Sequence, residues 1–319
     1  MIHKIYKRIN KETTKCYRYI WFTFFAKGRF SSSNSLIISS ETRGGSTWLT
    51  ELLVAHLPVA VVWEPLHPTK GILKKPDYNY GDRPFVDKHI VDLKLHSALG
   101  DVFSGKKFNP WTTERNTRST SKKAKYLLIK YVRANRLLPW MLNNFKFNYK
   151  PILLIRHPIA VAMSQLKSFY HLKDKTPGFI APDVNNNETY KEHEQYLNSL
   201  ESVLELHVAL WCINYVNILT DSIIENQTIR VYYEHMLLAP ENELTRIFSE
   251  WGLNLPIKKD ILRKNSSTTG KESISSDIQT QLKKWSTELD KKTLDKIQSI
   301  FDYFELKIYN SKEAVPLVK

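Results

Sequence analysis

The chain has 319 residues, of which 42% are hydrophobic and 25% charged, a balance that is typical of a folded protein with a sizeable core and excludes a disordered chain. Its formal net charge of +15 indicates an anionic partner, such as a polyanionic nucleotide, an acidic glycan, a membrane surface or nucleic acid. Only Cys16 and Cys212 occur, which excludes a disulfide framework or a cysteine-rich zinc cluster and favours a reducing, cytoplasmic compartment.

Residues 1–33 form a basic, aromatic N-terminal segment, which we expect to precede a main domain over residues 34–310 and a short tail over residues 311–319. The segment carries eight Lys and Arg residues against one acid, Glu12. Its apolar run, residues 19–25, is much shorter than the roughly 20 residues that a membrane span requires. Two interpretations stay open: a helix packed on the domain, or a segment lying peripherally on an anionic membrane surface.

Residues 35–49 predict a short buried strand, a glycine turn and an amphipathic helix. Gly44 and Gly45 allow the backbone to bend tightly and bring its N–H groups close to a ligand. Hydroxyl residues follow at the helix start, where unpaired amides and the positive end of the dipole favour an anion. Arg43 adds a charged, planar fork that suits phosphate or sulfate oxygens. The stretch therefore predicts an oxyanion site, and the alternative is an ordinary turn with a helix N-cap.

Residues 59–63 predict a second buried strand, and Glu64 and Pro65 follow it directly. A carboxylate at the end of such a strand and close to an anion loop is a candidate general base. The alternative is a surface-exposed glutamate at a strand end. Farther on, the polar and basic residues 105–125 predict a mobile loop, which we do not expect to contribute to the core.

Residues 126–129 predict a third buried strand, followed by Lys130 and Arg133. At the carboxyl end of a parallel strand these two cations would face the same crevice as Arg43, and the alternative is that they lie on the surface. Residues 137–145 predict a helix after this strand.

A fourth buried strand is predicted over residues 152–155, with Arg156 at its carboxyl end, where open α/β sheets bind ligands. Pro158 then starts a helix in which Ser164 lies about two turns along. This unit therefore predicts a second anion-binding position near the first.

The second half of the chain alternates predicted elements with polar segments. Residues 166–196 are polar and are expected to lie on the side of the site where an acceptor substrate binds. Residues 229–234 predict another strand. Residues 263–275 form a basic loop that contains a glycine. The predicted helices cover residues 199–219, 244–251 and 293–304. The first has a core stripe of Leu204, Val208, Trp211, Tyr215 and Ile218, with His207 expected as a packed or surface residue.

The two strand–turn–helix units together resemble the sulfotransferase family that uses 3′-phosphoadenosine 5′-phosphosulfate (PAPS). In that family a K/R-x-G-S/T-S/T-W loop holds the 5′-phosphosulfate, and an R-x-P-x-x-x-x-x-S segment grips the 3′-phosphate. The first pattern is matched, with Gly44 at its variable position, by Arg43, Gly45, Ser46, Thr47 and Trp48; the second is matched by Arg156, Pro158 and Ser164. His157 stands where the family usually has an acid.

The resemblance also implies roles for single residues. Carbohydrate sulfotransferases carry a Glu-Pro dipeptide at the position of Glu64, whose carboxylate is thought to deprotonate the acceptor hydroxyl. The segment from Lys130 to Arg133 resembles the K-x-V-R of N-acetylglucosamine 6-O-sulfotransferases, and the histidine base of cytosolic members is absent here. Tyr233 would lie near the adenine, and a late loop would bring Arg263 and Lys271 to the 3′-phosphate.

The sequence therefore predicts an α/β, three-layer fold of the P-loop-NTPase-like type with a central parallel sheet. The resemblance implies transfer of a sulfuryl group from PAPS to a hydroxyl, on a carbohydrate or glycolipid, with Glu64, Arg43 and Lys130 as catalytic residues and no metal or nucleic acid. One alternative is a P-loop-type nucleotide kinase, although the G-x-x-x-x-G-K-S/T pattern is absent. Another is a non-catalytic module that binds polyanions.

Overall fold

The computed structural model of the chain describes residues 2–26, 28–74, 78–81, 83–169, 188–264, 266–267 and 277–318. Lys271 and most of the polar segment 166–196 lie outside these ranges, so the expected contact of Lys271 and the expected acceptor role of that segment stay predictions.

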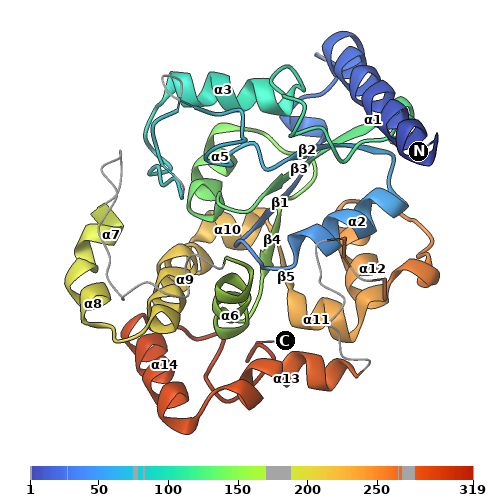
Figure 1. The fold of residues 1–319 in the computed structure, drawn as a ribbon. Coiled ribbons are helices and arrows are strands. Elements are labelled where there is room, and N and C mark those ends of the chain that lie inside the picture. Colours follow the sequence, from blue (N-terminus) through green and yellow to red (C-terminus); the bar gives the residue numbers. More distant parts are fainter. Residues whose placement is uncertain are drawn as a thin grey trace.

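Five parallel strands form one sheet at the centre of the molecule (Figure 1). They are β1 (Ser35–Ser40), β2 (Val59–Trp63), β3 (Tyr126–Tyr131), β4 (Ile152–Ile155) and β5 (Ile229–Tyr232), in the order β2-β3-β1-β4-β5. Their apolar runs are buried on both faces, as parallel strands between two helix layers require. The expected α/β fold of the P-loop-like type, with a central parallel sheet, is confirmed.

Helices occupy both faces of this sheet and the periphery. In chain order they are α1 (Ile2–Trp21), η1 (Phe22–Ala26), η2 (Ser32–Asn34), α2 (Ser46–His56), α3 (Leu93–Phe103), α4 (Arg118–Lys123), η3 (Asn135–Leu137), α5 (Leu138–Asn144), α6 (Pro158–Ser168), α7 (Glu188–Glu192), α8 (Glu194–Ser199), α9 (Val203–Leu219), α10 (Ser222–Gln227), α11 (Tyr233–Leu238), α12 (Pro240–Glu250), η5 (Lys259–Ile261), α13 (Ile278–Glu288) and α14 (Lys291–Tyr303).

Alternate residues of each strand enter different cores, because successive side chains of a strand point to opposite faces. Ile37 and Ile129 belong to the larger core, which also holds residues of α3, α5, α9 and α14. Ile38 and Leu128 belong to the smaller core under α2 and α12. The sheet therefore lies between two helix layers, as Figure 1 shows.

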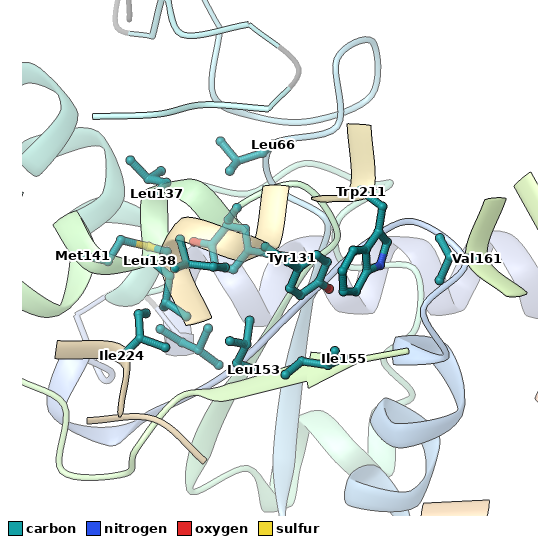
Figure 2. Packing of buried hydrophobic residues seen from close by; sticks show 14 of the residues in the cluster. Leu66, Tyr131, Leu137, Leu138, Met141, Leu153, Ile155, Val161, Trp211 and Ile224 are labelled. Atoms are coloured by element: carbon teal, nitrogen blue, oxygen red, sulfur yellow. The ribbon is translucent and has the colours of Figure 1, made fainter. Parts of the chain in front are cut away.

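The predicted stripe of α9 lies in the larger core, where Figure 2 shows Trp211 among Tyr131, Ile155 and Val161. Trp211 stacks on Tyr215 with ring centroids 4.3 Å apart. The helix begins at Val203, four residues later than expected, because the Ser202 hydroxyl accepts a hydrogen bond from the Glu205 amide and caps it there.

The expectation that residues 105–125 contribute nothing to the core is wrong. Thr112, Thr113 and Asn116 are buried. The Asn116 side chain accepts from the Val61 N–H and donates to the Val61 carbonyl oxygen, each at 2.7 Å, so it pairs with the outer edge of β2 as a strand would. The polar composition was misleading because an amide side chain can satisfy a buried backbone edge.

Part of the N-terminal segment packs on the domain, as one of the two interpretations expected, and the membrane contact stays a prediction. Trp21, Phe22 and Phe30 are buried in the larger core, so part of the segment packs on the domain. Phe24 and Phe25, on η1 between them, are 73% and 60% exposed. No described helix is both long and apolar enough to cross a bilayer.

Candidate functional site

The loop between β1 and α2 has the backbone form that its glycines predict. Residues 43–48, here called the cradle, contain two positive φ angles, 70° at Arg43 and 93° at Gly45. A Cβ on Gly45 would lie 2.3 Å from Cδ2 of Tyr233, and one on Gly44 would lie 2.8 Å from the Glu41 carbonyl oxygen, so glycine is required at both positions. Gly45 is the N-cap of α2 and offers no side-chain cap, which leaves the first amides of the helix to an external acceptor.

The second predicted anion position meets the cradle directly. Nε of Arg43 donates to Oγ of Ser164 at 3.1 Å, and Nη1 of Arg156 donates to the Arg43 carbonyl oxygen at 2.9 Å. Arg156 and Arg43 are 113 residues apart in sequence, and the parallel pairing of β4 with β1 brings them together.

Aromatic side chains cover the same position. β5 ends at Tyr232, one residue before Tyr233, which opens α11. The Arg156 guanidinium lies 4.4 Å from the ring centroid of Tyr233, and Trp48 meets this ring edge-on at 5.9 Å. We call Arg43, Arg156, Ser164 and Tyr233 the arginine cluster.

The two guanidinium groups of this cluster repel each other, and the buried Glu234 interacts electrostatically with Arg156. Among the described residues, neither Arg43 nor Arg156 forms an ion pair. Burial lowers the pKa of Arg43, and the positive charge of Arg156 lowers it further. Two half-buried like charges that form no ion pair are unfavourable, and a bound oxyanion would relieve both the repulsion and the desolvation.

The buried carboxylate of Glu41 supports the cradle, and the sequence did not single it out. Glu41 is 2% exposed; it accepts hydrogen bonds from the Thr42 amide at 3.0 Å and from Nη2 of Arg83 at 2.7 Å. Nδ2 of Asn214 donates to its other oxygen at 3.1 Å. In the sequence Glu41 directly follows a buried strand, and this is the same pattern that singled out Glu64.

Gln165 holds the cradle from the side of α6. Its Nε2 donates to the Thr42 carbonyl oxygen at 2.9 Å, and its Oε1 lies 2.7 Å from Nδ1 of His207. Burial, with the nearby charge of Arg83, lowers the pKa of His207 to about 4. His207 is therefore a neutral, packed histidine, as the sequence predicted.

Glu64 and Lys130 meet at the neighbouring strand ends. Lys130 lies inside β3, which runs two residues farther than predicted, and its Nζ is 2.7 Å from Oε1 of Glu64. Nη1 of Arg133 is 3.5 Å from Oε2 of the same carboxylate. Glu64 has φ 41°, a strained value of the kind that concentrates at functional sites. We call Glu64, Lys130 and Arg133 the glutamate cluster.

Lys130 is an unusual lysine because it is 2% exposed. Burial lowers its pKa to about 8, although Glu64 opposes the shift. Its Nζ lies 3.7 Å from the ring centroid of Trp63, and the guanidinium of Arg115 lies 4.5 Å from the same ring. Arg115, which the sequence did not single out, thus adds a further cation close to Lys130.

A small pocket adjoins the glutamate cluster, lined by Glu64, Leu66, His67, Tyr131, Val132 and Arg133. Val132, two residues after Lys130, stands at the position of the histidine base that the sequence comparison with cytosolic members found to be absent here. Nδ1 of His67 accepts hydrogen bonds from the amides of Thr69 and Lys70 at 3.3 and 3.2 Å, which orients this histidine in the turn after Glu64.

His157, which stands where the resembled family usually has an acid, is a structural residue. It is fully buried, with its Nε2 3.1 Å from the Asn310 carbonyl oxygen and its ring stacked on Trp285 at 4.6 Å. Burial lowers its pKa to about 3. Nδ1 of His157 accepts a hydrogen bond from the Ile159 amide and caps α6, so this helix start does not need an acidic side chain as its cap.

Of the basic loop over residues 263–275, the structure describes only residues 263, 264, 266 and 267. Arg263 lies exposed in a turn after η5. Ser267 is hydrogen-bonded to Glu51 of α2 and accepts from Nη1 of Arg115 at 3.3 Å, so this loop passes close to the cradle helix. Within the described ranges, no three His, Cys, Asp or Glu side chains are grouped so that they would hold a metal ion.

No protein-family model matches the chain, and no curated protein matches it in sequence. Among solved structures, the sulfotransferase domain of the Synechococcus PCC 7002 olefin synthase is similar over 88% of this chain and 97% of its own, with TM-score 0.43 and 18% identity. The sulfotransferase domain from the curacin biosynthetic pathway is similar over 86% and 98%, with TM-score 0.43 and 17% identity. Mouse sulfotransferase SULT7A1, complexed with PAP, is similar over 88% of each chain, with TM-score 0.41 and 13% identity. All three scores lie below 0.5, so the inference of an activity rests on the geometry of the site.

Proposed function

We propose that this protein is a sulfotransferase that moves a sulfuryl group from PAPS to a hydroxyl of a carbohydrate or glycolipid. The observation that carries the proposal is the arginine cluster beside the start of α2, in which Arg43 donates to Ser164 and Arg156 donates to the Arg43 carbonyl oxygen. A nucleotide with phosphates at both the 5′ and 3′ positions supplies two oxyanions for these two guanidinium groups.

The donor would lie across the arginine cluster. The cradle amides and Arg43 would hold the 5′-phosphosulfate, and Arg156 and Ser164 the 3′-phosphate, with the rings of Trp48 and Tyr233 beside the adenine. The hydrogen bond between Arg43 and Ser164 keeps these two proposed donor contacts next to each other.

The chemistry would proceed by in-line attack of the acceptor oxygen on sulfur. The acceptor proton goes to the Glu64 carboxylate, and the bond between sulfur and the bridging oxygen of the 5′-phosphate breaks. Negative charge then grows on the leaving phosphate, where Arg43 and the cradle amides stabilise it. Lys130 and Arg133 each contact one oxygen of the Glu64 carboxylate and orient it, which supports the assignment of Lys130 to the catalytic set. The carbohydrate acceptor rests on the resemblance of Glu64-Pro65 and of the Lys130–Arg133 segment.

Equilibrium binding of two nucleotides tests the donor site. We expect adenosine 3′,5′-bisphosphate to bind about 10–100-fold more tightly than adenosine 5′-monophosphate, the range for one hydrogen-bonded charged group. A kinase would prefer a nucleoside triphosphate with magnesium. A polyanion-binding module would show affinity that falls steeply with salt and no preference for the 3′-phosphate. Equal affinities for the two nucleotides would exclude the proposed donor.

We further propose that the N-terminal segment contacts an anionic membrane surface. Tyr19, Ile20, Phe24 and Phe25 are between 49% and 73% exposed, and the exposed Lys15 and Arg29 flank them. We expect sedimentation with vesicles of phosphatidylcholine containing 30% phosphatidylserine but not with phosphatidylcholine alone. Phe24→Ser with Phe25→Ser should reduce this binding about tenfold or more. Equal binding of this double variant would contradict the proposal.

A further inference from the structure

Arg136 is a buried cation that belongs to neither cluster. It lies in η3, five residues after the end of β3, and is 4% exposed. Its guanidinium carbon is 4.9 Å from the ring centroid of Phe85 and 4.7 Å from that of Tyr190. The charge is therefore held between two aromatic rings.

The guanidinium of Arg136 has donors without acceptors. Nη1 and Nη2 are buried and form no hydrogen bond, and no ion pair joins Arg136 to a described acid. Arg83, by contrast, is paired with Glu41 at 2.7 Å. Contacts with two rings offset only part of the hydration that a buried cation loses, so the arrangement lacks a counter-ion.

Two neighbours of Arg136, Asn135 and Tyr190, are linked by hydrogen bonds to residues next to the cradle. Asn135, the residue before Arg136, accepts a hydrogen bond from Oγ of Ser39 at 2.7 Å. The Tyr190 hydroxyl donates to Asn214 at 3.0 Å, and Asn214 in turn donates to Glu41 at the base of the cradle. Arg136 therefore lies beside the cradle, in a fixed relation to it.

We infer that Arg136 binds an oxyanion of the acceptor, a carboxylate or a sulfate ester, and that the acceptor is acidic. This inference rests on the proposed function. A planar guanidinium between two rings keeps its Nη1–Nη2 edge free of ring contact, and this edge matches two oxygens of one carboxylate or sulfate. Nη1 and Nη2 are buried and Phe85 is only half-buried, so the proposal requires that the Phe85 side chain move to admit the ligand. A net charge of +15 suits an acidic acceptor.

The test uses glucuronate as the probe and its uncharged methyl ester as the comparison, measured by ligand-observed NMR. Saturating adenosine 3′,5′-bisphosphate occupies the cradle, so the probe reports on a second position. The wild-type protein should bind glucuronate about tenfold or more tightly than the ester, and glucose 6-sulfate should compete for the same position. Arg136→Met should remove the preference, whereas the matched control Arg246→Met, at an exposed arginine paired with Glu243, should retain it.

Stability supplies the second measurement. Methionine keeps the packing between the rings and removes an unpaired charge, so Arg136→Met should melt no lower than the wild-type protein without ligand. The inference is overturned if the wild-type protein binds acid and ester equally, if Arg136→Met keeps the preference, or if Arg136→Met melts well below the wild-type protein. Failure of the bisphosphate to bind would contradict the donor site alone, because glucuronate can also be titrated without nucleotide.

Discussion

The arginine cluster and the glutamate cluster lie at the carboxyl ends of neighbouring strands, but their charges are balanced differently. Arg43 and Arg156 form no ion pair among the described residues. Lys130 and Arg133 share Glu64, at 2.7 and 3.5 Å. We propose that an anion from outside the chain completes the first cluster, whereas the second already contains a carboxylate of its own, which we propose as the proton acceptor.

This difference explains why similar residues at the two strand ends are expected to act at different stages. A cluster that forms no ion pair contributes mainly to binding an anionic donor and to stabilising charge that grows on it. A paired carboxylate contributes little to donor binding, and its effect appears in turnover. The predictions below test this division.

Glu64→Gln should give the largest effect. It keeps the shape of the side chain but removes the proton acceptor, so we expect turnover to fall about 10²–10⁴-fold with bisphosphate binding nearly unchanged. Measurement of kcat with saturating donor checks this. A loss below about threefold would assign Glu64 to a strand-end role and direct the search to His67.

A charge-matched control accompanies this variant because Glu64→Gln also leaves the buried Lys130 without its partner. The double variant Glu64→Gln with Lys130→Met removes both charges. Recovery of turnover in the double variant would mean that the loss came from an unpaired lysine, and continued inactivity is the expected result.

Arg43→Ala should lower turnover about 10²–10³-fold, the range for removing one donor to a developing oxyanion. Donor affinity should fall less, because the charge that Arg43 faces grows in the transition state. Comparison of kcat with the dissociation constant of the bisphosphate separates the two. Arg43→Lys should recover much of the activity; weakened binding with unchanged turnover would reduce Arg43 to a ground-state anchor.

Arg156→Ala should weaken binding of adenosine 3′,5′-bisphosphate by about 1.5–3 kcal/mol, the range for a hydrogen bond to a charged group. Adenosine 5′-monophosphate, which lacks the 3′-phosphate, should bind almost as before. Calorimetric titration of both ligands measures the difference. Equal losses would show that Arg156 acts through the Arg43 carbonyl oxygen that it contacts, and that its role is structural.

His157, between β4 and α6, should make the stability of the protein depend on pH. Its pKa in the folded protein is about 3, below the ordinary value of about 6.5, so the unfolded chain binds the proton first as the pH falls. Stability is therefore complete above pH 6.5 and is lost between pH 6.5 and 3, by about 2 kcal/mol at pH 5. Urea unfolding at pH 7 and 5 should show this loss in the wild-type protein and a smaller one in His157→Gln. An unchanged difference would contradict the assignment, and His89→Gln, at an exposed position, is the control.

The sequence by itself determined the sheet and the cradle. Runs such as Ile152–Ile155 are too short for an apolar helix and too apolar for a surface strand, so they fix parallel strands buried on both faces. The cradle was predictable because glycine and hydroxyl residues act through the backbone beside them. Arg43 and Arg156 were singled out for the same local reason, since each follows a buried strand.

Only the tertiary structure decided which polar residues serve the core and which remain without partners. Asn116 pairs with Val61 across 55 residues, and Glu41 finds Asn214 across 173, so neither contact leaves a local pattern. The sequence did not single out Arg136, whose burial between Phe85 and Tyr190 depends on elements far along the chain. The cost of burying a charge depends on everything packed around it, and this is why composition and spacing did not reveal it.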